Sequence, residues 1–110
     1  MKKEIIEINK ELGGTLRNSN SLDYAEEESK DEKNIYKKVA YFTRAIIVDH
    51  PFSDMNKSTA TIFAIREFRK HNIFCKEESL MKGFLKIAKK NITNLDKIEK
   101  GLRKWCLKKK

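Results

Sequence analysis

Apolar side chains recur at intervals of three and four residues along most of the chain, which is the spacing of one face of an α-helix. The clearest stripe is formed by Ile35, Val39, Phe42 and Ile46. Residues 59–72 are apolar around most of the helical circumference and are predicted to form a buried central helix. Four further stripes predict four more helices: Ile5, Ile8 and Leu12; Leu22 and Ala25; Leu80, Phe84 and Ile87; and Leu95, Ile98, Leu102 and Trp105.

Short polar residues mark where these helices begin, because their side chains can accept hydrogen bonds from the first N–H groups of a helix. The residues predicted in this role are Ser21, the pair Ser29 and Glu32, and Thr93 or Asn94. Gly13 and Gly14 are expected to end the first helix, and residues 73–75 to form a short apolar link. The chain is therefore predicted to be one all-α domain over residues 1–110, a bundle of five or six helices.

Two glycines lie inside the predicted helices. Gly83 and Gly101 each cost about 1 kcal/mol relative to alanine at such positions. They indicate either close contact between helices or local fraying.

The composition limits the class of protein. A chain of 110 residues can bury enough surface to fold without a metal ion or disulfides. Its two cysteines, Cys75 and Cys106, have no metal-ligand spacing, and no signal peptide or membrane span is evident at the N-terminus. We therefore expect a cytoplasmic protein that does not enter the membrane, with Cys75 as a packed thiol.

The net charge of +9 is unevenly distributed. Residues 1–70 hold 13 basic and 12 acidic side chains, a net charge of +1, whereas residues 71–110 hold 12 and 4, a net charge of +8. This bias is compatible with a nucleic-acid surface or an acidic protein partner. A solvated helical face is the favoured interpretation, because lysine outnumbers arginine and no aromatic residues are interleaved.

The residues that could carry chemistry are concentrated in the segment 50–61, His-Pro-Phe-Ser-Asp-Met-Asn-Lys-Ser-Thr-Ala-Thr. Pro51 cannot continue a helix, so a loop is predicted there, with a new helix starting near Ser58 or Thr59. The loop carries an imidazole (His50), a carboxylate, an amide and an ammonium group. Backbone N–H groups at the start of a helix favour an anion. The segment therefore predicts a base, a metal ligand and a phosphate site side by side.

This segment resembles the signature of the Fic/Doc family, whose Doc form reads His-x-Phe-x-Asp-Ala-Asn-Lys-Arg-Thr-Ala. The chain departs from that pattern at Met55, where the family has a small residue, and at Ser58, where it has arginine. The resemblance spans roughly residues 12–107 and implies the Fic fold, a helical bundle in which the signature loop joins two core helices. Seven of the nine specified positions agree: His50, Phe52, Asp54, Asn56, Lys57, Thr59 and Ala60.

The resemblance implies a role for each matched side chain. His50 would be the general base that takes the proton from a hydroxyl of a target protein, a task suited to an imidazole. Asp54 would hold Mg²⁺ on the phosphates of ATP. Asn56 and the loop amides would stabilise the charge on the transferred phosphate, and Lys57 would neutralise phosphate. Phe52 would anchor the loop in the core.

Ser58 stands at the remaining phosphate-binding position. A single hydroxyl cannot replace the two parallel hydrogen bonds of an arginine, so the resemblance implies a weakened enzyme. Most family members transfer AMP from ATP to a Ser, Thr or Tyr hydroxyl (AMPylation). The Doc branch is a kinase of translation elongation factor Tu and the toxin of a toxin–antitoxin pair. Lys57 favours the Doc branch, which implies an elongation-factor-like or other cytosolic target and an antitoxin partner.

Two other interpretations remain open. The chain could be a Fic scaffold without catalysis that keeps an anion pocket or a protein-docking face. It could also be a basic helical protein that binds nucleic acid through residues 76–110. Taken singly, His50 fits a helix end, Asp54 and Asn56 fit a turn, and Lys57 fits a solvated surface. Taken together at the matching spacing, they favour the enzyme.

Overall fold

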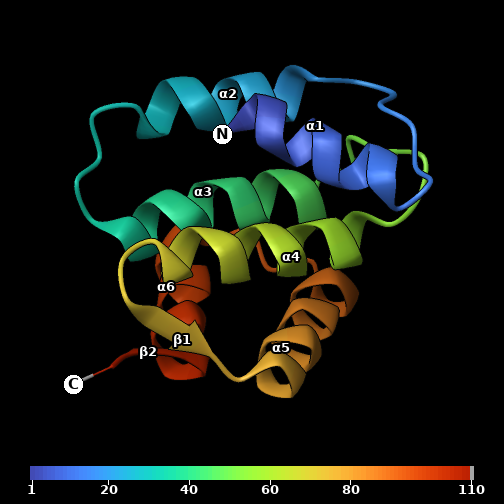
Figure 1. Ribbon diagram of the computed structural model, residues 1–110. Coiled ribbons are helices and arrows are strands. Elements are labelled where there is room, and N and C mark those ends of the chain that lie inside the picture. The colour runs from blue at the N-terminus through green and yellow to red at the C-terminus, as the bar shows by residue number, and fades with distance from the viewer. Residues whose placement is uncertain (110) are drawn as a thin grey trace.

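The computed structural model describes residues 1–109, which form six α-helices and one two-stranded antiparallel sheet. The predicted helical class is confirmed, whereas the sheet was not predicted. The elements follow the order α1 (Lys2–Glu11), α2 (Asn20–Ser29), α3 (Ile35–Ile47), α4 (Asn56–Arg69), β1 (Ile73–Cys75), α5 (Glu77–Lys90), α6 (Leu95–Trp105) and β2 (Cys106–Lys108) (Figure 1).

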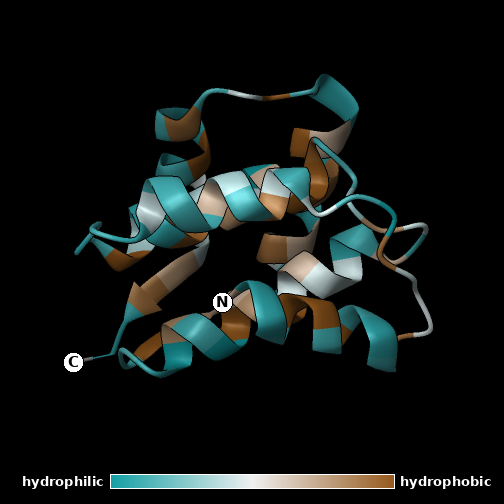
Figure 2. Ribbon diagram, turned by 90° about the horizontal axis from the view of Figure 1, so that it is seen from above, coloured by the Kyte–Doolittle hydropathy of each residue, from teal (hydrophilic) through white to brown (hydrophobic). Residues whose placement is uncertain are grey.

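The helices are arranged on three levels, with α3 and α4 in the middle, α1 and α2 above, and α5 and α6 below (Figure 1). Helix α3 packs against α2, α4 and α6, while α4 packs against α1, α3 and α5. The helices carry both hydrophobic and hydrophilic bands (Figure 2), as amphipathic helices do. Within residues 1–109 no helix combines the length and apolar character that crossing a membrane requires.

Helix α4 is the central helix that the sequence predicts. Its buried side chains include Phe63 and Phe68, and the ring of Phe63 lies 5.6 Å from that of Phe42 on α3. The helix begins at Asn56, earlier than the predicted start at Ser58 or Thr59. The reason lies in the side chain of Asn56, which closes the preceding loop as described below.

The caps were predicted correctly in one of three places. Asn94 caps α6 and accepts a hydrogen bond from Lys97 N at 3.0 Å. Helix α2 starts at Asn20, so Ser21 lies inside it and donates to the carbonyl oxygen of Ala45 at 3.1 Å instead.

The predicted capping box before α3 is also wrong. Ser29 is the buried last residue of α2, and Glu32 lies in the connector. Asn34 caps α3 because its extended backbone lets Oδ1 accept from Tyr36 N at 3.0 Å and Lys37 N at 3.4 Å.

The predicted apolar link at residues 73–75 is the strand β1, which pairs with β2. This register places Cys75 opposite Cys106, and the two form a disulfide bond. The expectation that Cys75 is a packed thiol is therefore wrong. The prediction failed because the disulfide depends on an antiparallel pairing between segments 31 residues apart, which the local sequence does not reveal.

The glycines inside α5 and α6 mark close helix contact, and fraying is not needed to explain them. The indole of Trp105 packs against both Gly83 and Gly101, and a Cβ at either position would collide with the ring. The same indole meets Phe84 edge to face, with 6.2 Å between ring centroids. Small residues thus let α5 and α6 approach across one aromatic side chain.

Candidate functional site

The loop that joins α3 and α4 is held in place by the segment 15–18, which runs beside it. The Phe52 side chain is buried at 1% exposure, so the loop is also anchored in the core. These constraints fix the backbone on which the predicted site residues stand. The two segments are joined by an antiparallel bridge between Leu16 and Phe52 and by hydrogen bonds from Arg17 N to Pro51 O (2.8 Å), from Asn18 N to Pro51 O (3.1 Å) and from Ser53 N to Thr15 O (2.8 Å).

Asn56 closes this loop from its other end. Its Oδ1 accepts a hydrogen bond from Phe52 N at 3.2 Å, and its Nδ2 donates to Phe52 O at 3.0 Å. Both polar atoms of the Asn56 amide therefore bond the backbone of Phe52. These two bonds close the turn that precedes α4. Direct contact between this amide and a phosphate stays a prediction.

Asn9 is a supporting residue that the sequence analysis missed. Its amide is 1% exposed, and its Nδ2 donates to Asp54 O at 2.9 Å and to Thr59 Oγ1 at 3.1 Å. A Cβ on Gly14 would collide with this amide, so glycine leaves room for it. The signal in the sequence is an amide on the apolar face of the first helix. Asn9 thus ties α1 to both sides of the start of α4.

His50 and Asp54 lie exposed on the loop surface. The backbone of His50 is left-handed, with φ of 50°, and within residues 1–109 its side chain makes no hydrogen bond. Asp54 accepts a hydrogen bond from Met55 N at Oδ1, at 2.7 Å, and keeps Oδ2 for a ligand. In the described part of the chain, no hydrogen bond joins the imidazole to the carboxylate.

The start of α4 brings two of the predicted phosphate-binding residues together. Among the described residues 1–109, no side chain caps the first turn of this helix, so its N–H groups are available to an anion. Beside this turn lies a hollow of about 270 Å³ between α4 and α5, with a basic rim and an apolar wall. Its lining consists of Lys57, Ser58, Thr61, Met81, Lys82 and Leu85.

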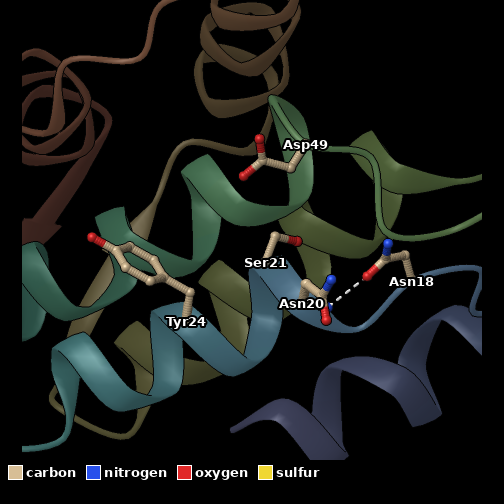
Figure 3. A pocket seen from close by; sticks show the side chains of 5 residues that line it. All are labelled: Asn18, Asn20, Ser21, Tyr24 and Asp49. Carbon is tan, nitrogen blue, oxygen red and sulfur yellow. Dashed lines mark hydrogen bonds between the residues drawn. The ribbon is translucent and has the colours of Figure 1, made fainter.

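A second hollow, of about 350 Å³, lies near the His50 end of the loop. Figure 3 shows its lining side chains, which come from the N-terminal part of α2, from the residue Asn18 before it and from Asp49 after α3. Asp49 directly precedes His50 in the chain. The lining residues are of polar types and include Asn20, Ser21 and Tyr24. Neither hollow is lined by His50, Asp54 or Asn56.

The chain by itself offers few ligands for a metal ion. Over residues 1–109 no group of three or more His, Cys, Asp or Glu side chains is placed to hold one. Magnesium commonly uses one or two carboxylates together with substrate phosphates and water. A single exposed carboxylate such as that of Asp54 is compatible with that mode.

No protein-family model, curated protein or solved structure matches the chain. The resemblance to the Fic/Doc family therefore rests on the segment 50–60 and on the order of helices around it.

Met55 provides a test of the loop geometry. Its backbone is left-handed, with φ of 63°, which costs a residue with a Cβ about 1–2 kcal/mol. We expect Met55→Gly to raise the free energy of unfolding by about 0.5 kcal/mol, since lost side-chain burial and the freer unfolded chain offset part of the gain. Urea-induced unfolding followed by circular dichroism measures this. Met55→Ala is the control, and a glycine variant no more stable than it would contradict the prediction.

Proposed function

We propose that the chain is a Doc-like transferase that moves a phosphate or AMP from ATP to a hydroxyl side chain of a target protein. The observation that carries the proposal is the fixed loop that ends at the uncapped first turn of α4, beside the hollow lined by Lys57 and Ser58. An anchored backbone with free N–H groups is the arrangement that stabilises charge on a transferred phosphate. The exposed His50 is accessible to a side chain of another protein.

In the proposed reaction, His50 accepts the proton of the target hydroxyl while its oxygen attacks a phosphorus atom of ATP. For phosphate transfer the bond between the γ-phosphorus and the β-bridging oxygen breaks and ADP leaves. For AMP transfer the bond at the α-phosphorus breaks and pyrophosphate leaves. Lys57 and the first N–H groups of α4 balance the charge that develops, and Asp54 would hold the Mg²⁺ that neutralises phosphate charge on the nucleotide.

The hollow beside α4 has one basic and one apolar wall, and these match the phosphates and the base of a nucleotide. Lys57 and Lys82 are cations for the phosphates, and Met81 and Leu85 offer apolar surface to a base. Met81 is 50% exposed and Leu85 is 41% exposed. A nucleotide base in contact with Met81 and Leu85 would cover this exposed apolar surface. A target like elongation factor Tu, or another cytosolic protein, and an antitoxin remain part of the proposal.

Transfer from radiolabelled ATP to lysate proteins tests the proposal. We expect labelling in the presence of Mg²⁺ by the unaltered chain, and a loss of at least about 100-fold in His50→Ala, the range for removal of a general base. His71→Ala is the matched control, because His71 is also exposed and follows α4. Label at the γ-position reports phosphate transfer, and label at the α-position reports AMP transfer. Equal labelling by both variants, or none by the unaltered chain, would rule out the enzyme.

Ser58→Arg is expected to strengthen the reaction. An arginine there would reach the phosphate with charge-assisted hydrogen bonds worth about 1.5–3 kcal/mol, which corresponds to roughly 10- to 100-fold in rate if they form in the transition state. The initial rate of label transfer measures the gain. Thr93→Arg, at an exposed residue between α5 and α6 whose side chain makes no hydrogen bond within residues 1–109, should give none. A folded Ser58→Arg variant without transfer would favour the binding scaffold over the enzyme.

A further inference from the structure

Most basic side chains in the last third of the chain belong to one pair of helices, α5 and α6. Of the net charge of +9, residues 71–110 carry +8. Helices α5 and α6 hold eight of the 12 basic residues of this segment and all four of its acidic residues, a net charge of +4, and the other four basic residues flank the two helices. Both helices form the lower level of the fold, where α5 packs on α4 and α6 packs on α3 (Figure 1). The charge is therefore placed at one end of the molecule.

The lysines of α5 and α6 lie on the sides that face away from the core. On α5 they follow at intervals of four and three, opposite the buried Leu80, Phe84 and Ile87. On α6 they follow at three and four, opposite the buried Ile98 and Leu102. The two helices meet through Gly83 and Trp105, so their outer sides adjoin. We name this surface the basic helix face: Lys82, Lys86, Lys89, Lys97, Lys100 and Lys104, all exposed.

Most of these ammonium groups have no acidic partner. Lys82 pairs with Glu78 at 3.1 Å, and both side chains are exposed. Across residues 1–109 the other five lysines of the basic helix face form no ion pair. Exposed pairs such as Lys82 with Glu78 contribute little and are screened by salt. The face therefore presents nearly its full charge to a partner.

The chemistry of the face favours a phosphate backbone over other anionic partners. Helix α5 has 14 residues, about 21 Å, a length that lies beside roughly 12 phosphate charges of a nucleic-acid duplex. A helix that inserts into a membrane surface needs an apolar side formed by several large side chains, whereas α5 exposes two, Met81 and Leu85, and α6 exposes none. The basic helix face also lacks the aromatic rings on which single-stranded bases stack.

We propose that the basic helix face binds the backbone of double-stranded nucleic acid without reading its sequence. Lysine ammonium groups contact phosphate oxygens and displace condensed counterions, which makes such binding steeply dependent on salt. This binding does not rest on the transferase proposed above: Lys82 also lines the hollow beside α4, but none of the residues 50–58 belongs to the basic helix face. It gives the last third of the chain a function that the loop between α3 and α4 does not explain.

Fluorescence anisotropy with a labelled DNA duplex of mixed sequence tests the proposal, at salt concentrations from 50 to 200 mM. The variant is Lys86→Glu/Lys89→Glu/Lys100→Glu, and the control is Lys3→Glu/Lys10→Glu/Lys33→Glu, which changes the net charge equally at exposed lysines outside the face. We expect the first to lose at least tenfold in affinity at low salt and to reduce the slope of log K against log salt by about 2.7, the value for three phosphate contacts. The control should lose less than threefold.

Three outcomes would overturn the proposal. One is no binding of the unaltered chain to the duplex at 50 mM salt. Another is an equal loss in both triple variants, which would mean that net charge alone attracts the duplex. The third is sedimentation with phosphatidylserine vesicles but no binding to the duplex, which would assign the face to a membrane surface. Circular dichroism of both variants verifies that they remain folded.

Discussion

Phe52→Ala is expected to lower the free energy of unfolding by about 3–5 kcal/mol, the cost of truncating a buried aromatic side chain and leaving a cavity. The side chain is 1% exposed, and its backbone holds both the bridge to Leu16 and the two hydrogen bonds to Asn56. Domains of this kind are stable by about 5–15 kcal/mol in total, so the loss is a large share. Urea-induced unfolding followed by circular dichroism measures it.

Two control variants separate the effect of the buried Phe52 ring from the effect of removing any aromatic ring. Phe74→Ala removes an equal ring that is 43% exposed, and we expect it to cost less than half as much. Phe52→Leu keeps most of the volume and should cost under about 1.5 kcal/mol. A loss below 1 kcal/mol in Phe52→Ala would mean that the loop is held by its hydrogen bonds alone.

Opening the disulfide is expected to lower the free energy of unfolding by about 3–4 kcal/mol. The bond joins Cys75 and Cys106, which are 31 residues apart, and a cross-link over such a loop removes roughly that much entropy from the unfolded chain in the loop-closure model. The loss is measured from urea-induced unfolding with and without reductant. We also expect two thiols to become reactive only after reduction.

Cys75→Ala/Cys106→Ala provides the matched control for the reductant. Its stability should lie near that of the reduced chain and should not change when reductant is added. Identical unfolding of the unaltered chain with and without reductant would contradict the prediction. Immediate reaction of both cysteines with a thiol reagent in the folded, unreduced chain would do so as well.

The disulfide also bears on the proposed cytosolic target. Structural disulfides persist in oxidising compartments and are rare in the cytosol, where glutathione and thioredoxin keep thiols reduced. In the cytosol the chain would therefore work with open Cys75 and Cys106 and with the lower stability given above. The reductant experiment measures whether the fold tolerates that state.

The helices could be predicted from sequence because the evidence for them is local. The stripe Ile35, Val39, Phe42 and Ile46 identifies the buried face of a helix within a few turns. Helices α3 and α4 lie in the segments where the apolar pattern predicts them. Helix starts were less predictable, since a capping side chain competes with other hydrogen bonds. The Ser21 hydroxyl, for example, does not cap a helix and instead donates to the carbonyl oxygen of Ala45, which belongs to a different helix.

The candidate site was predicted as a set of residues and only partly as an arrangement. The sequence predicted Lys57 in the loop and Ser58 near the start of a helix, and the fold places both in the first turn of α4 and in one hollow. The sequence did not reveal that the Asn56 amide bonds the backbone of Phe52, or that Asn9 on α1 donates a hydrogen bond to the carbonyl oxygen of Asp54. Those contacts depend on how distant segments pack, and no local pattern encodes them.

The sequence by itself determined the helical class, the position of the loop with its chemical groups, and the concentration of positive charge in the last third of the chain. Tertiary structure alone decided the pairing of β1 with β2, the bond between their cysteines, and the walls of both hollows. The physical reason is the range of the interactions. Helical periodicity acts over three or four residues, whereas strand register and packing against α5 depend on segments brought together only by folding.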